Sequence, residues 1–511
     1  MLSKVNGSAV YGIEALPITV EVNIDPGVGY HLVGLPDNAI RESNYRIASA
    51  LSQIGYRIPG KKITINLSPA DLRKEGACYD LPLALGILLA SGQLYSDILP
   101  DYLIMGELSL DGQLQPIKGA LPIALAAFKN GLKGVVLPKS NAPEAAVVQG
   151  LEVRGASSLG EVIEFFKGNM ELERAFFPGI PTQEDSVLDF PDFSEVRGQE
   201  TVKRCMEIAA AGGHNLILIG PPGSGKTMMA RRLPGILPPM SLEEALETTK
   251  IHSVSAGASP DGLIWERPFR SPHHTISNVA LVGGGSYPQP GEISLAHNGV
   301  LFLDELPEFK KHVLEVLRQP LEDRQITISR SRFTITYPSS FMLVASMNPS
   351  PSGYFIPSEQ GAYRNSANAM RRYMSKISGP LLDRIDIHLE VSPVPFEEIS
   401  SGRQGEPSRL VRNRVVAART LQVKRFTAEF GIHSNAQMGP RQIRQYCILK
   451  TGPKNLLKHA MERLELSARA YDRILKVSRT IADLDANLNI TEKHLSEAIQ
   501  YRSLDREGWL G

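Results

Sequence analysis

The pattern of apolar and polar positions divides the chain into three parts. In residues 1–170, short apolar runs typical of strands alternate with longer runs of helical periodicity. A second alternation of strands and helices runs through residues 193–395, and in residues 396–511 apolar positions recur mainly at helical spacing. The sequence therefore predicts a multidomain α/β protein with two α/β units and a C-terminal helical unit.

Particular segments carry the prediction for the first unit and its boundary. The strand-like runs cover residues 18–24, 63–67 and 134–137, and the helix-like runs cover 38–54, 81–91 and 119–130. Residues 171–192 contain several prolines and acidic residues, which is typical of a linker. The longest apolar stretch, 81–90, is too short to cross a bilayer and indicates a core helix. Because the N-terminus also lacks an apolar signal core, we expect a cytoplasmic protein with no membrane partner.

A phosphate-binding loop is the strongest chemical signal in the chain. Every fixed position of the pattern G-x-x-x-x-G-K-[ST] is matched by Gly220, Pro221, Pro222, Gly223, Ser224, Gly225, Lys226 and Thr227. An apolar run precedes the loop and a helical run follows it, which is the order that wraps backbone N–H groups around phosphates. We expect ATP and Mg²⁺ as cofactors, with Lys226 on the β- and γ-phosphates and the Thr227 hydroxyl on Mg²⁺.

Acidic and polar residues follow two further buried strands. The apolar run 300–303 leads directly into Asp304 and Glu305, the Walker B arrangement. Asp304 is expected to hold Mg²⁺, and Glu305 to polarise the attacking water as a general base. The run 341–346 leads to Asn348, which resembles the sensor 1 residue of AAA+ ATPases. The order of these motifs predicts nucleotide hydrolysis.

Two arginines complete the resemblance to AAA+ ATPases. The segment 381–386 is similar to the L-L-x-R-[FI]-D signature of the Mg-chelatase and MCM branch, which implies that Arg384 is an arginine finger. Arg469, at the start of a late helix, resembles sensor 2, although a surface arginine is the open alternative. A finger that reaches a neighbour's nucleotide requires a closed ring, so we expect a homo-oligomer, a hexamer by family resemblance.

A hairpin with a basic tip follows the Walker B motif. Residues 325–329 and 333–337 alternate apolar and polar positions and flank Arg330 and Arg332. In the Mg-chelatase and MCM branch a hairpin at this place projects into the ring, so these arginines are candidate DNA contacts; a solvated turn is the alternative. The insert before Walker B contains His273 and His274, whose rings are expected to point apart and not to share a metal.

Composition narrows the classes of protein to which the chain can belong. The 511-residue chain has a net charge of +1, so nucleic-acid binding requires a local basic surface. Its three cysteines form no C-x-x-C pair, which argues against a disulfide framework or a zinc site. Length and composition are typical of a globular protein with about three domains.

Longer segments resemble the ComM/YifB family of bacterial Mg-chelatase-like AAA+ proteins. They cover 10–15, 33–37, 66–70, 283–305, 346–353 and 379–391. The resemblance implies an N-terminal Lon-protease-like domain (1–170), a linker (171–192), an AAA+ ATPase (193–395) and a C-terminal helical lid (396–511). It also implies an ATP-driven ring helicase or translocase that binds single-stranded and branched DNA. This motor would promote branch migration when incoming DNA recombines in natural transformation. A nucleotide-dependent assembly switch and a Mg-chelatase-like motor acting on a protein client remain alternatives.

The Lon-protease-like domain lacks the expected catalytic pair. Cys78 stands at the position that matches the family's nucleophile, and Leu121 stands where the family has its lysine. Serine peptidases of this type need the lysine to activate the nucleophile. We therefore expect a scaffold or DNA-binding role for this domain, with Cys78 as a small buried side chain.

Overall fold

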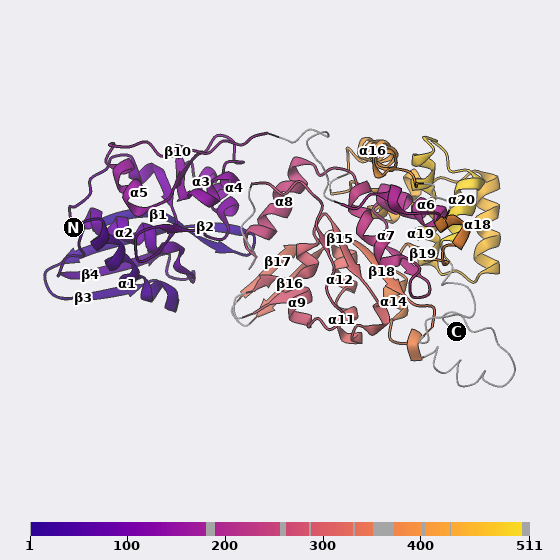
Figure 1. Cartoon of the computed structure of the whole chain (residues 1–511), viewed down its shortest axis with the longest axis horizontal. Coiled ribbons are helices and arrows are strands. Elements are labelled where there is room, and N and C mark those ends of the chain that lie inside the picture. The colour runs from indigo at the N-terminus through magenta and orange to yellow at the C-terminus, as the bar shows by residue number, and fades with distance from the viewer. Residues whose placement is uncertain are drawn as a thin grey trace.

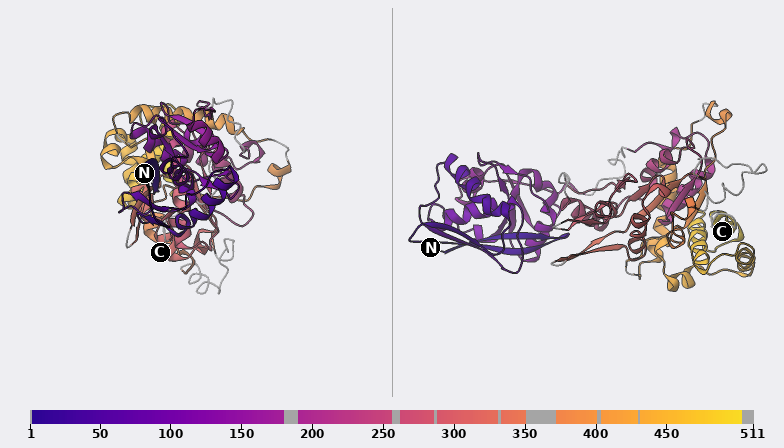
Figure 2. Two further views of the ribbon diagram at one scale, coloured as in Figure 1. Left: turned by 90° about the vertical axis from the view of Figure 1, so that its left-hand side faces the viewer. Right: turned by 90° about the horizontal axis from the view of Figure 1, so that it is seen from below.

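The computed structural model describes residues 2–179, 190–255, 262–285, 288–330, 333–350, 372–400, 404–429 and 431–502. These residues form an elongated molecule (Figures 1 and 2). The first α/β unit lies at one end, the second α/β unit lies in the middle, and the C-terminal helices lie at the other end.

The first unit is built on an eight-stranded sheet of order β10-β9-β8-β5-β1-β2-β4-β3. Its longest strand pairs are antiparallel, whereas β1, β5, β8 and β9 run parallel. In β2, Ile18, Val20 and Val22 are buried on alternate positions, as expected for a strand with one face on a core. The strands are β1 (Leu2–Tyr11), β2 (Glu14–Asp25), β3 (Gly29–Val33), β4 (Lys62–Ser68), β5 (Tyr102–Ile104), β8 (Gly134–Pro138), β9 (Glu152–Ala156) and β10 (Glu173–Arg174).

Five α-helices accompany this sheet in the described part of the unit, and all three predicted helices are confirmed. The helices are α1 (Asn38–Gln53), α2 (Asp80–Ala90), α3 (Ala120–Lys129), α4 (Ala142–Ala145) and α5 (Leu159–Phe166). Asp37 caps α1 by accepting a hydrogen bond from the Ile40 N–H at 2.9 Å. Nearly every residue of α2 is buried, which is why its sequence is apolar on all sides rather than on one stripe. A two-stranded ribbon, β6 (Glu107–Leu108) with β7 (Leu114–Gln115), follows β5.

The sheet extends into the segment expected to be a linker. Strand β10 pairs antiparallel with β9, where Glu173 lies opposite Gly155. Phe177 stacks on Trp265 of the second unit with ring centroids 6.5 Å apart. The first residues of the expected linker therefore belong to the folded unit, and residues 180–189 lie outside the described residues.

The second unit contains a five-stranded sheet of order β12-β15-β18-β11-β19, in which every neighbouring pair is parallel. Side chains of β11 alternate between two cores: Leu216 and Leu218 face one, and Ile217 and Ile219 face the other. Both faces are therefore covered, which explains why these strands are apolar throughout. The strands are β11 (Leu216–Ile219), β12 (Phe269–Arg270), β15 (Val300–Leu303), β18 (Met342–Met347) and β19 (Ile387–Glu390).

Short helices and two ribbons surround this sheet. The predicted hairpin is confirmed as β16 paired with β17. A smaller ribbon pairs β13 with β14. The elements are α6 (Glu200–Gly212), α7 (Lys226–Arg232), α8 (Leu242–Ser253), α9 (Asn278–Val282), β13 (Gly283–Gly284), β14 (Gln289–Pro290), α10 (Glu292–Leu295), α11 (Lys311–Glu315), α12 (Arg318–Asp323), β16 (Gln325–Arg330), β17 (Phe333–Pro338) and α14 (Gly379–Leu382).

The C-terminal helices share a core with the second unit. One hydrophobic cluster contains Cys205 and Ile208 of α6 together with Val415 of α16 and Ile474 of α19. The predicted helical region is confirmed, but its packing is continuous with one face of the ATPase-type sheet. The helices are α15 (Phe396–Ser400), α16 (Ser408–Arg425), α17 (Pro440–Tyr446), α18 (Thr451–Arg463), α19 (Ala468–Leu484) and α20 (Glu492–Gln500).

The two α/β units touch through a turn and a helix end. The β1–β2 turn reaches the β16–β17 hairpin, so closely that a Cβ on Gly12 would lie 2.7 Å from Ile335 Cγ2. Gly12 also has a φ of +64°, a conformation that glycine adopts without steric cost. Nearby, the Gly119 N–H donates to the Ser253 carbonyl at the end of α8 over 3.0 Å. The first unit thus contacts the hairpin directly.

Candidate nucleotide-binding site

The phosphate loop joins β11 to α7, so the predicted strand–loop–helix order is confirmed. Gly223 and Gly225 have φ values of +79° and +87°, which only glycine adopts readily. A Cβ on Gly220 would lie 2.3 Å from the Val391 carbonyl oxygen, so the loop start has no room for a side chain. The Ser224 Oγ is buried without a hydrogen-bond partner among the described residues. The glycines therefore keep an open, polar cradle at the carboxyl edge of the sheet.

Lys226 points back into this loop. Its Nζ donates to the carbonyl oxygens of Gly220 (2.7 Å) and Pro221 (2.9 Å) and to Asn348 Oδ1 (3.3 Å). Burial lowers the pKa of Lys226, and the negative charges of Asp304 and Glu305 oppose that shift. Two predicted site residues, Lys226 and Asn348, are thus in direct contact although they are far apart in the chain.

The acidic pair follows β15 at the same edge. Thr227 Oγ1 donates to Asp304 Oδ2 over 2.7 Å, so the two expected Mg²⁺ ligands already touch. Ser346 of β18 donates to Asp304 Oδ1 and also accepts the Glu305 N–H at 3.3 Å. Sequence reasoning missed Ser346, whose only signal is a polar residue at the end of a buried strand. Its contacts orient the Asp304 carboxylate toward Thr227.

Glu305 leaves the strand in an unusual backbone conformation. Its φ is +55°, in the left-handed region that a glutamate adopts rarely. The side chain is 57% exposed, and Oε2 lies 3.9 Å from His274 Nδ1. The carboxylate therefore stands at the solvent side of the site, where an attacking water has access.

The two adjacent histidines differ from the expectation. The rings of His273 and His274 lie 4.0 Å apart at 35° and do not point apart. His273 Nδ1 shares a hydrogen bond with Thr275 Oγ1 at 2.9 Å, which orients the first ring, and His274 packs edge-on against Phe309. The turn after β12 thus places one histidine beside Glu305, a contact that spacing along the chain did not indicate.

Arg384 lies at the opposite edge of the sheet. It precedes β19, whose first residue, Ile387, pairs with Leu216 at the start of β11. Four strand residues, about 13 Å of rise, separate this edge from the phosphate loop. The Arg384 Nη2 lies 2.5 Å from Glu322 Oε1, and Nη1 donates to the Pro380 carbonyl at 2.5 Å. Arg384 therefore does not meet its own chain's phosphate loop.

Arg469 pairs with Asp383, the residue before Arg384 in the chain. Its Nη1 is 3.2 Å from Asp383 Oδ2, and the side chain is 60% exposed. The pairing brings Arg469 to the Asp383–Arg384 segment at the amino edge. Their predicted roles as arginine finger and sensor 2 stay predictions.

A buried acid fixes the segment that carries Arg384. Asp386 is almost fully buried and lies 2.9 Å from Arg473 of α19, and it accepts the Asn215 N–H at 3.1 Å. Its Oδ2 also lies 3.4 Å from His214 Nδ1. Burial raises the pKa of Asp386, but the Arg473 charge and His214 outweigh this and hold the pKa well below its usual range. Asp386 therefore stays ionised and joins the Arg384 segment to α19.

The basic hairpin tip is described only in part. Backbone pairing extends to Arg330 opposite Phe333, which confirms the hairpin itself. Arg332 and the side chain of Arg330 lie outside the described residues. Their contact with DNA stays a prediction.

Cys78 is a packing residue, but it is partly buried and not fully buried as predicted. Its side chain packs against the core of the first unit, and burial raises the pKa of the thiol to about 12. Leu121 is fully buried, and its N–H donates to Glu144 Oε1 over 2.8 Å. Since the thiolate is the nucleophilic form, this environment does not activate Cys78.

The residues at the carboxyl edge fit a Mg²⁺-bound nucleoside triphosphate. The glycine cradle and Ser224 leave room and polar atoms for phosphates, and Lys226 supplies a cation. Thr227 and Asp304 supply the oxygen ligands that Mg²⁺ prefers. Among the described residues, His, Cys, Asp and Glu form no group of three or more suited to another metal site.

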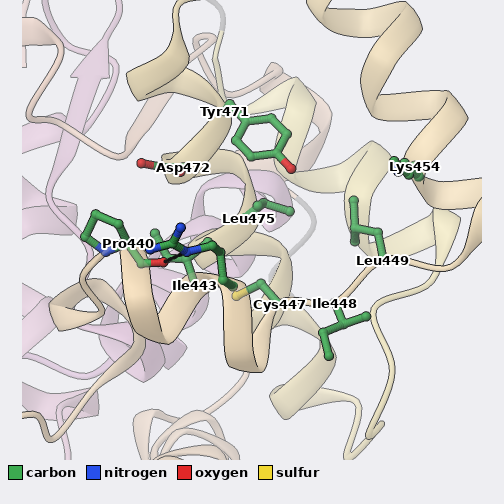
Figure 3. A pocket seen from close by; sticks show the side chains of 10 residues that line it. Pro440, Ile443, Cys447, Ile448, Leu449, Lys454, Tyr471, Asp472 and Leu475 are labelled. Carbon is green, nitrogen blue, oxygen red and sulfur yellow. Dashed lines mark hydrogen bonds between the residues drawn. The ribbon is translucent and has the colours of Figure 1, made fainter.

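A separate pocket lies among the C-terminal helices and shares no residue with the phosphate-loop site (Figure 3). Tyr471, Asp472 and Leu475 of α19 face residues at the end of α17 and the start of α18. Its lining residues are Pro440, Ile443, Arg444, Cys447, Ile448, Leu449, Lys454, Tyr471, Asp472 and Leu475.

Comparison with known proteins places this geometry in a family. Three family descriptions match: "Magnesium chelatase, subunit ChlI" over residues 192–399, "Subunit ChlI of Mg-chelatase" over 20–141, and "Magnesium chelatase, subunit ChlI C-terminal" over 405–502. The chain is 48% identical over 509 residues to the uncharacterized protein YifB of Escherichia coli, covering 99% of this chain and 98% of that protein. It is 43% identical over 512 residues to the competence protein ComM of Haemophilus influenzae, with the same coverage.

The chain belongs to the ComM/YifB family. A more distant relative is the magnesium-chelatase 38 kDa subunit of Cereibacter sphaeroides, 27% identical over 180 residues that span 31% of this chain and 53% of that protein. The predicted family is therefore confirmed, and with it a Mg-chelatase-type AAA+ ATPase unit and its C-terminal unit. The Lon-protease-like character of the first unit stays a prediction. Within the described residues, every helix is too short or too polar to cross a bilayer.

Proposed function

We propose that this ComM/YifB protein is an ATP-driven ring, by family resemblance a hexamer, that moves branched DNA when incoming DNA recombines during natural transformation. The observation that carries the proposal is the division of charged and polar site residues between two edges of one sheet. Lys226, Thr227 and Asp304 meet at the carboxyl edge, whereas Arg384 and Arg469 lie at the amino edge.

This division supports hydrolysis between subunits. A group at the amino edge cannot reach phosphates at the carboxyl edge of its own sheet, because the strands separate them. When two subunits meet edge to edge, Arg384 of one chain can face the phosphate loop of the next. Such an arginine stabilises the charge that develops during phosphoryl transfer.

Each carboxyl-edge residue has a role in this proposal. Lys226 binds the phosphates, Thr227 and Asp304 hold Mg²⁺, and Asn348 and Glu305 position and polarise the attacking water. ATP with Mg²⁺ supplies the phosphoanhydride bond whose hydrolysis drives the motor. Arg330 and Arg332, which stand between the two hairpin strands in the sequence, are the proposed contacts to DNA phosphates.

A Mg-chelatase-like motor on a protein client is the second candidate. It is favoured by the match to the magnesium-chelatase 38 kDa subunit, which spans only 31% of the chain. The full-length similarity to a protein named for competence favours DNA as the molecule on which the motor acts. A nucleotide-dependent assembly switch remains a further alternative, in which DNA would leave the ATPase rate unchanged.

The test is ATP-dependent branch migration of a synthetic four-way or three-strand DNA junction by the full-length protein. We expect movement by the wild type and none by Glu305→Gln, which should still bind ATP. Glu308→Gln is the matched control, because Glu308 is a nearby glutamate that pairs with Lys376 outside the proposed machinery. No junction movement and no DNA stimulation of the ATPase by the wild type would contradict the DNA-motor proposal and favour a protein client.

A further inference from the structure

Glu322 connects Arg384 to another part of the same chain. Its Oε1 lies 2.5 Å from Arg384 Nη2. The Arg384 side chain is only 12% exposed, whereas that of Glu322 is 53% exposed. The arginine expected to act on a neighbour's nucleotide is therefore paired with an acid of its own chain.

Glu322 also lies at the base of the β16–β17 hairpin. It belongs to α12, which ends at Asp323, and β16 begins at Gln325. Between them, the Arg324 carbonyl accepts the Ser339 N–H at 2.8 Å, which closes the base of the hairpin just beyond β17. The hairpin is therefore joined to α12 by a short, hydrogen-bonded connection.

A second contact joins α12 to the segment that carries the arginine. Arg318 Nη2 donates to Ser378 Oγ over 3.3 Å, directly before α14. Helix α12 thus touches the segment 378–384 at both of its ends, through Arg318 and through Glu322. These two contacts join α12 directly to the segment that carries Arg384.

We propose that Glu322 is a positioning residue that holds Arg384 within its own chain until DNA contacts the hairpin. Displacement of the hairpin then withdraws Glu322 and leaves Arg384 to pair with the phosphates of the neighbouring subunit. The proposal rests on the proposed function, because it takes the hairpin as the DNA contact and Arg384 as a group acting on a neighbour. The exchange is chemically reasonable, since a carboxylate and a phosphate compete for the same guanidinium and water screens the half-exposed Glu322.

The experiment compares the ATPase rates of full-length wild type and Glu322→Gln, with and without a four-way DNA junction, at saturating Mg²⁺-ATP. We expect the rate without DNA to rise at least roughly fivefold, the lower end of coupling between two sites. The ratio of the rates with and without DNA should fall toward one. ATP affinity should stay unchanged, because the phosphate loop is untouched.

Two further variants separate positioning from general effects. Asp323→Asn removes the same charge one residue along α12, where Asp323 is exposed and makes no ion pair with a described residue. It should keep the wild-type rates. Glu322→Asp retains the charge and should restore much of the low rate without DNA.

The outcomes are distinct. An unchanged or lower rate of Glu322→Gln without DNA, or an equal rise in Asp323→Asn, would overturn the proposal. If no DNA stimulates the wild type, the DNA-motor function fails. If the ATPase rate without DNA rises only in Glu322→Gln, that result would still support the restraint of Arg384 by Glu322.

Discussion

The two edges of the five-stranded sheet hold their charged and polar residues in different ways. At the carboxyl edge, Lys226, Thr227 and Asp304 bond to loop carbonyls or to one another. At the amino edge, Arg384 and Arg469 pair with acids from neighbouring elements, Glu322 and Asp383. The first edge is organised around the place where phosphates would bind, and the second presents cations without a phosphate cradle. One sheet can therefore supply two different halves of a site shared between subunits.

The largest expected effect tests whether each hydrolysis site combines the carboxyl edge of one subunit with the amino edge of its neighbour. Arg384→Ala should bind ATP normally but lose about 1,000-fold or more in hydrolysis, because an arginine in this role contributes that much where it acts. Mixing Arg384→Ala with Glu305→Gln should restore part of the ATPase, since some interfaces then combine an intact phosphate-loop site with an intact arginine. Mixed rings with no activity would indicate that Arg384 does not act on a neighbour.

A smaller effect is expected at the carboxyl edge. Lys226→Ala should weaken ATP binding by about 100-fold, because hydrogen bonds from a charged donor contribute about 1.5–3 kcal/mol. Equilibrium titration with a fluorescent ATP analogue measures this. Arg384→Ala is the control. Equal loss of ATP binding in both variants would contradict the assignment of phosphate binding to the carboxyl edge alone.

The connection of the amino edge to α19 predicts a moderate effect. Asp386→Asn should lower hydrolysis by about tenfold with ATP binding retained, because misplacing a catalytic group costs up to about 100-fold. Mixing with Glu305→Gln should restore part of the activity, as predicted for Arg384→Ala.

Asp483→Asn is the matched control for Asp386→Asn. Asp483 is also a buried acid, and it pairs with Arg425 and Arg479 within the C-terminal helices and not with the Arg384 segment. Removing either acid should destabilise the fold, since each removes the carboxylate partner of at least one partly or fully buried arginine. Equal loss of hydrolysis in both variants would argue for a general folding defect.

The smallest effect concerns the first unit, where it adjoins α8. Burial raises the pKa of Glu144 to about 7, so the folded protein holds this proton at pH values where the unfolded chain has lost it. The stability contribution of this group therefore falls as pH rises from about 4.5 to about 7, by up to about 3 kcal/mol at about 1.4 kcal/mol per pKa unit.

Glu144→Gln removes this ionisation while keeping an oxygen for the Leu121 N–H. Its melting temperature should exceed that of the wild type at pH 8 and approach it at pH 5, as measured by calorimetry. Glu171→Gln, an exposed residue, is the control. If the melting temperatures of wild type and Glu144→Gln differ by the same amount at pH 5 and at pH 8, the pH dependence does not come from the Glu144 carboxyl.

The features that could be predicted from the sequence are those set by residues close together in the chain. The phosphate loop, the Asp304–Glu305 pair and the hairpin were each placed correctly, because each depends on neighbours within a few residues. The contact of Ser346 with Asp304 spans 42 residues and depends on β15 and β18 being adjacent strands. The orientation of the adjacent histidines was predicted wrongly, because it depends on the turn after β12 and on Phe309. The predicted linker starts at residue 171 and so includes the edge strand β10, because a two-residue strand has almost no sequence signal.

The sequence alone determined the chemical groups of this protein and their order along the chain: phosphate loop, acidic pair, Asn348, Arg384 and Arg469. Glycine conformation, apolar strand runs and charged residue types are local properties, so they can be recognised without the fold. Only the tertiary structure decided which groups meet. Parallel strand order places Arg384 and the phosphate loop at opposite edges, and the packing of α12 and α19 brings Glu322 and Asp386 to the arginine segment. These contacts join residues from distant segments, and they form only when apolar surfaces of those segments are buried together.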